Sequence, residues 1–156
     1  MHVLDWLAGL PPAVWIQESG TAYLLVNAAH ILGISLLLGG IIVLDLRLIG
    51  IVGSFPIAAV GPVLLRASAT GLGLAFLAGF WLFLVKPREY LSNPAFLAKL
   101  GLLGAAICNI GLQHCGPRFR AALQGESVHV KVRFHAAVSL IIWLAVLLAG
   151  RWIGFV

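Results

Sequence analysis

Apolar residues fill four long stretches of the chain, which cover residues 21–45, 67–85, 95–114 and 134–150. Each stretch is close to the ~20 residues that an α-helix needs to cross a hydrocarbon core about 30 Å thick. Their apolar residues are continuous and do not alternate with polar ones, which is typical of helices and not of a membrane β-barrel. The pattern predicts an all-α, integral membrane four-helix bundle.

Residues that end helices separate the four stretches. Pro56 lies between the first and the second, Pro94 lies between the second and the third, and Gly116-Pro117 follows the third directly. Proline has no backbone N–H and cannot continue a helix. The third connection, residues 118–132, is polar enough to form an amphipathic surface helix. We therefore expect one four-span domain over residues 1–156.

A short amphipathic segment precedes the first span. Leu4, Trp6 and Leu7 give it an apolar face, and Pro11 ends it before any long apolar run. Tryptophan and tyrosine favour the headgroup region of a bilayer, which suits Trp6 and also Trp15 further along. The pattern predicts a short N-terminal helix that lies in the membrane interface.

Composition agrees with a membrane protein and excludes a nucleic-acid-binding one. The chain is 62% hydrophobic and 10% charged, whereas soluble domains carry about 25% charged residues. The net charge of +5 comes from basic residues at the span ends, where they meet lipid headgroups. No soluble segment interleaves basic and aromatic residues as a nucleic-acid site requires. The expected partner is the lipid bilayer, and no nucleic acid is expected.

The basic residues also predict an orientation. Four spans place both termini on one side of the membrane. That side carries Lys86, Arg88, Lys99 and Arg151, and the other side carries Arg47, Arg66, Arg118, Arg120, Lys131 and Arg133. Cytoplasmic loops carry an excess of Lys and Arg. The bias of six to four predicts that the first and third connections are cytoplasmic and that both termini are periplasmic.

His30 lies about nine residues into the first span. Asn27 precedes it by three residues and Tyr23 by seven, so the three residues share one face of a helix. That face cannot favourably contact lipid, and we expect it to point into the bundle. Ionisable residues inside membranes are costly and usually functional. His30 is therefore either a ligand of a cofactor or a hydrogen-bonding contact between helices.

Two more histidines lie at span ends that share one membrane side. His114 ends the third span and His135 begins the fourth, so a hairpin would bring them to a similar depth. Two imidazoles on facing helices can bind one haem iron axially, or one copper or zinc ion. Arg118 and Arg133 lie nearby and have the planar fork that pairs with carboxylates such as haem propionates. The alternative is that both histidines contact headgroups at the interface.

A haem bound by His30 would need other basic residues than Arg118 and Arg133 to pair with its propionates. His30 lies nearer the side of the termini, where Lys86, Arg88 and Lys99 would face the propionates. The second axial ligand is not obvious, because the second span has no histidine and Met1 is the only methionine.

Copper is the alternative metal, since thiolates favour Cu(I). Cys108 and Cys115 lie seven residues apart on one predicted helix, about 10 Å along its axis. That separation exceeds the Cα–Cα limit of about 7 Å for a disulfide. The chain has no Cys-x-x-Cys motif, and no set of nucleophile and base appears either, so any catalysis would belong to a cofactor.

Small residues recur on all four spans. They include Gly33 and Gly40 on the first span, Gly71 and Gly79 on the second, Gly104 on the third and Ala145 on the fourth. Small residues let helices approach closely in lipid. The same faces would also suit a homo-oligomer, or would clear space for a flat cofactor.

Several segments of the chain resemble a known group of proteins. Residues 26–33 (VNAAHILG), 39–40 (GG), 45–50 (DLRLIG), 88–91 (REYL) and 93–100 (NPAFLAKL) resemble an uncharacterised group of small bacterial four-helix membrane proteins. The resemblance covers most of the chain. It implies a bacterial inner (cytoplasmic) membrane protein.

A more distant similarity reaches two better-described groups. The His30 helix with its paired glycines, followed by Lys99 at the start of the third helix, is similar to the copper-resistance D membrane domain. It is also similar to HemJ-type protoporphyrinogen oxidases, and that resemblance implies haem b on a first-helix histidine. Arg133-Phe134-His135 lies where those proteins begin their last helix, although His114 fits the HemJ pattern only loosely and His135 departs from it.

These observations lead to one hypothesis and three alternatives. The hypothesis is a membrane protein that binds haem b through His30, with a second haem through His114 and His135, and that transfers electrons within the membrane to or from quinone or another membrane redox partner. The alternatives are a copper-handling protein of the copper-resistance D type, a HemJ-like porphyrin oxidase, and a non-catalytic membrane subunit.

Overall fold

The computed structural model describes residues 3–53 and 55–155, and these residues form helices without any strand. The elements are α1 (Val3–Ala8), α2 (Pro11–Glu18), α3 (Gly20–Ile49), α4 (Ile57–Val85), α5 (Pro87–Ser92), α6 (Pro94–His114), α7 (Pro117–Leu123), α8 (Val130–Trp152) and a final 3₁₀ turn, η1 (Ile153–Phe155).

Four of these helices are long and apolar enough to cross a membrane: α3, α4, α6, and α8 with η1. Large apolar side chains remain on their outer surfaces, and Leu24 and Leu77 are 63% and 69% exposed. A soluble protein would bury such a surface, whereas a bilayer solvates it. The prediction of four spans and an all-α bundle is confirmed, and the chain is a multi-pass membrane protein.

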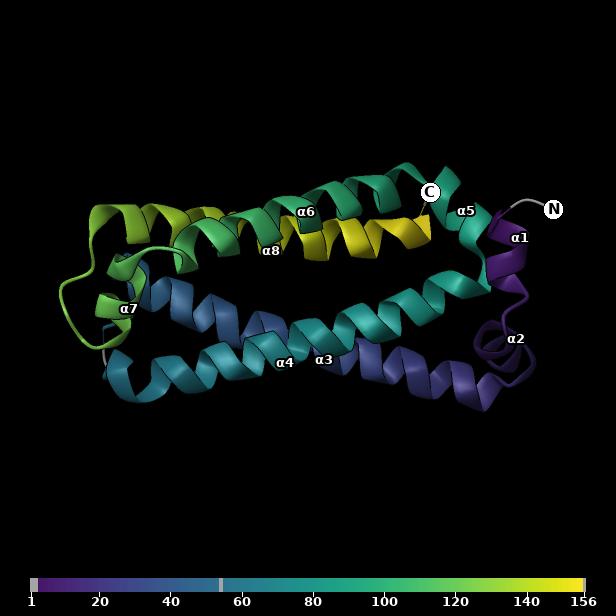
Figure 1. The fold of residues 1–156 in the computed structure, drawn as a ribbon, viewed down its shortest axis with the longest axis horizontal. Helices are drawn as coiled ribbons and strands as arrows, with labels where there is room; N and C mark the ends of the chain where they lie inside the picture. The colour runs from purple at the N-terminus through teal and green to yellow at the C-terminus, as the bar shows by residue number, and fades with distance from the viewer. Residues whose placement is uncertain (1–2, 54, 156) are drawn as a thin grey trace.

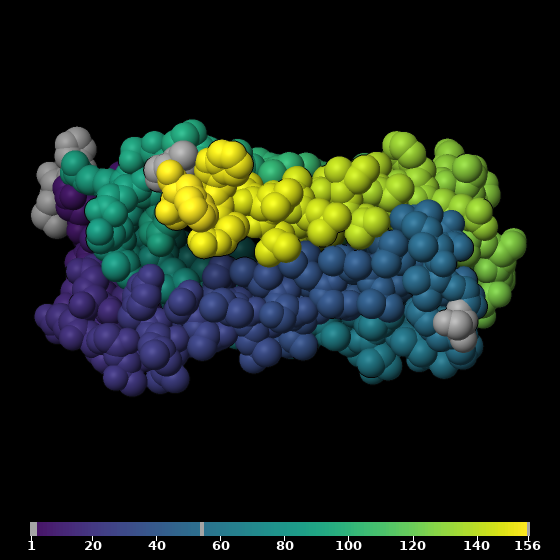
Figure 2. Space-filling view, turned by 180° about the vertical axis from the view of Figure 1, so that it is seen from behind, coloured from purple at the N-terminus to yellow at the C-terminus, as the bar shows by residue number. Residues whose placement is uncertain are grey.

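The four long helices form two layers. The antiparallel pair α3 and α4 makes one layer, and the antiparallel pair α6 and α8 makes the other (Figure 1). Both termini lie at one end of the bundle with α1, α2 and α5, which we call the terminus end; α7 lies at the opposite end, the loop end (Figure 1). Seen from behind, α8 lies along α3 (Figure 2).

Glycines bring α3 and α4 into backbone contact. A Cβ atom on Gly33 would lie 2.5 Å from the backbone nitrogen of Ala75 and 2.9 Å from the carbonyl oxygen of Gly71. A Cβ atom on Gly71 would overlap the backbone nitrogen of Leu37. Close backbone approach is how helices associate in lipid, where burial of apolar surface gives no driving force. The predicted packing role of these glycines is therefore confirmed for the α3–α4 pair.

The packed core is not uniform along the bundle. At the loop end, a cluster around Leu44, Leu48 and Phe119 joins α3, α7 and α8, and in the middle Ile41 and Trp143 belong to a second cluster that joins the two layers. The third cluster, at the terminus end, contains buried residues of α2, α3 and α4 only. The two layers are therefore held together in the loop half and the middle, and separate toward the terminus end.

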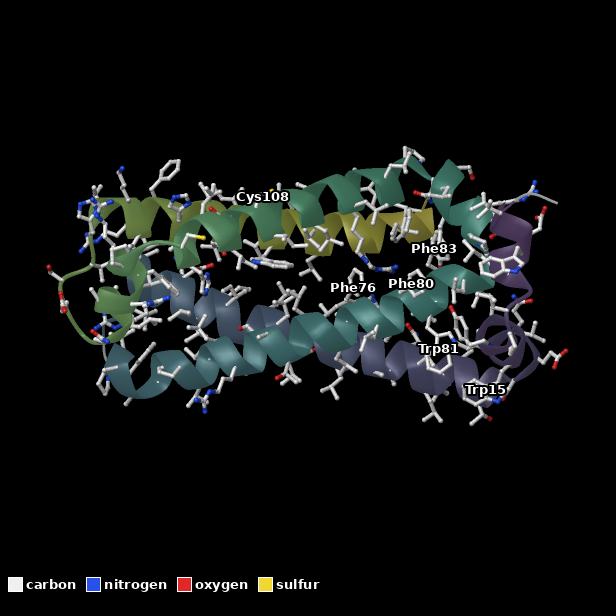
Figure 3. All side chains as sticks on the ribbon, viewed as in Figure 1. Trp15, Phe76, Phe80, Trp81, Phe83 and Cys108 are labelled. Atoms are coloured by element: carbon white, nitrogen blue, oxygen red, sulfur yellow. The ribbon has the colours of Figure 1, made fainter. Side chains whose placement is uncertain are left out.

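The short helices α1 and α2 pack on the terminus end. The sequence predicted a short interfacial helix in this N-terminal segment. Trp81 on α4 donates its indole N–H to the carbonyl oxygen of Pro12 over 2.8 Å. The rings of Trp15 and Trp81 have centroids 5.8 Å apart, and both lie at this end of α4 (Figure 3). The N-terminal segment thus forms two helices that contact the spans.

The two largest differences from the expected boundaries concern α4 and α7. α4 begins at Ile57, ten residues before the expected start at residue 67, and continues through Pro62 and the exposed Arg66. The surface helix expected over residues 118–132 is limited to α7, which ends at Leu123 before Gly125 adopts a left-handed φ of 93°.

We predict that Gly71→Ala lowers the free energy of unfolding by about 1–3 kcal/mol, because the new methyl group pushes apart two backbones that cannot yield. The matched control is Gly73→Ala, which lies two residues away on α4 and meets open space. The measurement is unfolding in detergent on addition of SDS. Equal effects of the two substitutions would contradict the close α3–α4 contact.

Candidate functional site

A cavity of about 720 Å³ lies between the two layers, where they separate. Cavities of about 300–1,000 Å³ are usual for small-molecule and cofactor sites. Residues of α3, α4, α5, α6 and α8 line it. Almost all of these side chains are apolar, and the polar exceptions are Asn27, His30, Lys99 and Arg151.

Packed side chains bound the cavity at both ends. Toward the middle of the bundle, Leu37 and the fully buried Trp143 separate it from the packed half. Toward the terminus end, the rings of Phe83 and Phe96 stack with centroids 5.7 Å apart and planes 4° apart. Tyr90 packs against Phe96 behind them, and burial raises the pKa of its phenol. Packed side chains therefore lie at both ends of the cavity along the axis of the bundle.

The flanks of the cavity are open. Ile31 on one flank and Phe76 and Phe80 on the other line the cavity and are 56%, 66% and 52% exposed. Figure 3 shows Phe76, Phe80 and Phe83 following the edge of α4 that faces the other layer. Because these flanks lie between membrane-spanning helices, they face the hydrocarbon region of a bilayer. A ligand can therefore enter sideways from the membrane.

His30 lines the cavity, and one of its ring nitrogens is held by a hydrogen bond. Its Nδ1 lies 2.8 Å from the carbonyl oxygen of Ala75. A carbonyl oxygen only accepts, so Nδ1 donates and the neutral ring leaves Nε2 unprotonated. Among the described residues Nε2 has no hydrogen-bond partner. Metal-binding histidines are characteristically held by a hydrogen bond of this kind from the other ring nitrogen.

Gly79 gives the imidazole its space. A Cβ atom at Gly79 would lie 2.8 Å from Cε1 and 3.1 Å from Nδ1 of His30. Ala75 and Gly79 are four residues apart, so they are neighbours on one face of α4. The ring is thus held by a hydrogen bond at one turn and by backbone contact at the next. The sequence pattern predicts a packing role for Gly79 and carries no signal of its contact with the imidazole.

Within the described part of the chain, two cations and no acidic residue line the cavity. The Lys99 side chain reaches α8, where a Cβ atom on Gly150 would lie 3.6 Å from its Nζ. The guanidinium group of Arg151 lies over the Phe155 ring at 4.7 Å from its centroid. The ion pairs of the described residues involve neither cation. A half-buried cation without a counter-charge is costly, and its position in a cavity suits an anionic ligand.

The other two cations that we expected near His30 lie elsewhere. Arg88 pairs with Asp5 over 2.6 Å and ties α5 to α1, and Lys86 pairs with Glu89 over 2.9 Å. Both pairs are exposed at the terminus end, and neither basic residue lines the cavity. Of the three expected cations, the structure places Lys99 in the cavity, and it adds Arg151.

His114 and His135 have separate partners. His114 Nδ1 donates to the carbonyl oxygen of Ile110 on its own helix over 2.9 Å. His135 Nδ1 lies 2.8 Å from Asn109 Oδ1, and Asn109 Nδ2 donates to the His135 carbonyl oxygen over 3.1 Å. Asn109 precedes His114 by five residues, about 7.5 Å along the helix. Neither histidine lines the cavity.

The remaining candidate ligands lie on the surface. Arg118 and Arg133 are exposed and make no ion pair among the described residues. Cys108 and Cys115 are free and exposed, and Cys108 lies on the side of α6 away from the α4 aromatic residues (Figure 3). Within the described part of the chain, no three His, Cys, Asp or Glu residues are grouped so that they could hold a metal ion.

Only part of the polar face predicted for the first span lies inside the bundle. Asn27 and His30 line the cavity, as expected, whereas Tyr23 is exposed. Tyr23 lies near the start of α3, where a tyrosine can reach the headgroup region.

Comparison with known proteins gives no further guide: no family model, curated protein or solved structure matches the chain significantly. Function must therefore be inferred from the cavity itself.

We predict that Lys99→Met stabilises the ligand-free protein by about 1 kcal/mol, because it removes an unpaired, half-buried charge and keeps the length of the side chain. The control is Lys86→Met, which removes an exposed cation and its pair with Glu89 and should change stability by less than about 1 kcal/mol. Thermal unfolding in detergent measures both. A loss of stability in Lys99→Met would show that Lys99 has a structural partner and is not held for a ligand.

Proposed function

We propose that the cavity binds haem b, with Nε2 of His30 as the axial ligand of the iron, and that the protein transfers electrons within the membrane. The observation that carries this proposal is the His30 imidazole, fixed through Nδ1 with Nε2 free in a large apolar cavity. A histidine that served only as a contact between helices would not need such a cavity beside it.

The residues of the cavity fit haem in three further respects. The cavity volume of about 720 Å³ is in the usual range for cofactors, and its apolar walls suit the porphyrin ring. Lys99 and Arg151 supply positive charge for the two propionates. His30 is the single histidine among the described residues of the lining, so it would be the one imidazole of the cavity that could hold the haem.

Haem would supply one-electron chemistry, and this chain's residues would bind and orient it. Ala75 fixes the ring tautomer of His30, and the stacked Phe83 and Phe96 exclude water from the terminus end of the cavity. The open flanks support a partner that is dissolved in the bilayer, such as a quinone. A second haem at His114 and His135 stays a prediction, since their described contacts do not join the two imidazoles.

The proposed location is the bacterial inner membrane with the termini in the periplasm. The loop end carries six basic residues and the terminus end carries four, which favours a cytoplasmic loop end. In this orientation the His30 cavity would lie in the periplasmic half of the bilayer. A homo-oligomer also stays a prediction.

The alternatives receive unequal support. Copper handling would call for soft ligands, and the described residues of the cavity lining include no cysteine and no methionine. A porphyrin oxidase of the HemJ type would use the same apolar, cationic cavity for a tetrapyrrole substrate, so this alternative shares the observations that favour haem. It differs in predicting that the chain rescues a bacterial strain that lacks protoporphyrinogen oxidase. In a non-catalytic subunit, His30→Ala would reduce stability and have no other effect.

We predict that the detergent-purified protein, supplied with haem during expression, shows a Soret band that shifts on reduction with dithionite and again on addition of carbon monoxide, because the described lining offers no second histidine that would compete with carbon monoxide. His30→Ala should lose the band. His135→Ala and His114→Ala are the matched controls and should keep it. Absorption spectra and haem content per chain are the measurements.

A full haem complement in His30→Ala would contradict the proposal, and loss of the band in His135→Ala alone would assign the haem to the other histidine pair. Lys99→Met should weaken haem binding by about tenfold, which corresponds to about 1.4 kcal/mol, whereas Arg88→Met should leave haem affinity unchanged.

A further inference from the structure

The loop half of the bundle, beyond Trp143, contains buried polar side chains that the proposed haem site does not use. Asp45, Asn109, Gln113 and Ser139 are all less than 8% exposed, although this half of the core is otherwise apolar. Buried polar groups inside a membrane are costly and usually have a function.

Asp45 on α3 is the most unusual of them. It is 1% exposed, and neither carboxylate oxygen has a hydrogen-bond partner among the described residues. Arg47 lies two residues away on a different face of the helix, and its Nε donates to the carbonyl oxygen of Phe55 over 3.1 Å. An ionised carboxylate without partners in such a place would cost many kcal/mol, and such a group binds a proton instead.

Among the described residues, no cation of a neighbouring helix forms an ion pair with Asp45. α4 carries one charged residue, Arg66, which is exposed, and Lys99 of α6 lies in the cavity. The basic residues of α7 and α8 are all exposed. From α8 the Ser139 hydroxyl lies close enough to interact with the carboxyl group, although it makes no hydrogen bond of ordinary geometry. The neighbours of Asp45 thus offer a hydroxyl group and no counter-charge.

Further polar groups lead from Ser139 toward the loop end. His135 lies four residues before Ser139, one turn closer to that end and on the same face of α8. It pairs with Asn109 of α6 over 2.8 Å. Gln113 lies one more turn along α6, buried, with its Nε2 unpaired among the described residues. Polar groups therefore occur at successive turns, about 6 Å apart, a spacing that water molecules can bridge.

We propose that Asp45 is an intramembrane proton-binding site, which exchanges its proton with water at the loop end along this line of polar groups. When Asp45 takes up a proton, an O–H bond forms on its carboxylate as an O–H or N–H bond on the donor breaks. The proton comes from the water at the loop end. His135 and Ser139 can pass the proton, and Asn109 holds His135 in place. The site lies fifteen residues from His30, about 22 Å along α3, and does not depend on what the cavity binds.

The composition of the chain allows a direct test by infrared spectroscopy. The chain contains two aspartates, Asp5 and Asp45, and Asp5 is exposed and paired with Arg88. In the Asp5→Asn variant with ¹³C in the aspartate carboxyl group, Asp45 is the single labelled carboxyl group. We expect its band at the position of a protonated acid at neutral pH, with a shift in D₂O. The same band should be missing from Asp45→Asn.

A labelled band at the carboxylate position would overturn the proposal, and so would a carboxylate band that moves with the identity of the alkali cation, which would assign a metal-ion site. The Asp5→Asn measurement does not require Asp45→Asn to fold. The pathway has its own test, since His135→Gln should slow the shift in D₂O by about tenfold. His114→Gln is the control and should leave the rate unchanged; equal rates in the two variants would overturn the pathway through His135.

Discussion

The backbone contact between α3 and α4 is the interaction on which the rest of the structure depends. Gly33 and Gly71 let the two helices approach closely, and that approach places His30 against Ala75 and Gly79. A hydrogen bond of 2.8 Å to the Ala75 carbonyl oxygen then orients the imidazole. A bulkier interface would move α4 outward, and His30 would lose both the hydrogen bond and the position of its ring beside the cavity.

One half of the bundle is a packed core, and the other half contains the cavity. In the loop half, Leu44, Leu48 and Phe119 join both layers in one apolar core, and Trp143 closes this region from the cavity. In the terminus half, the layers separate around a cavity with an unpaired Lys99. Open volume and unpaired charge both lower stability, so the packed half must compensate for them, as binding sites commonly require. The short helices α1, α2 and α5 add contacts at the end where the layers are apart.

The sequence predicted the spans well and the site in part. Continuous hydrophobicity is a strong signal in a membrane chain, and a polar residue such as His30 must face the interior, so its position could be inferred. The hydrogen bond to the Ala75 carbonyl group could not be inferred, because every residue has a backbone carbonyl group and the residue type does not show which one accepts. Which cations reach the cavity depends on the rotation and length of each helix. Arg88 lies on α5 and pairs with Asp5, whereas Arg151 lies on the last turn of α8 and lines the cavity.

The most direct test of the account is ¹⁵N NMR of histidine-labelled protein in lipid bilayers, with His30 assigned by its loss in His30→Gln. The account predicts a neutral His30 with its proton on Nδ1 and an unprotonated Nε2, and it predicts that haem perturbs the Nε2 signal of this histidine more than that of any other. A proton on Nε2 of His30, or a haem effect confined to His114 and His135, would contradict it.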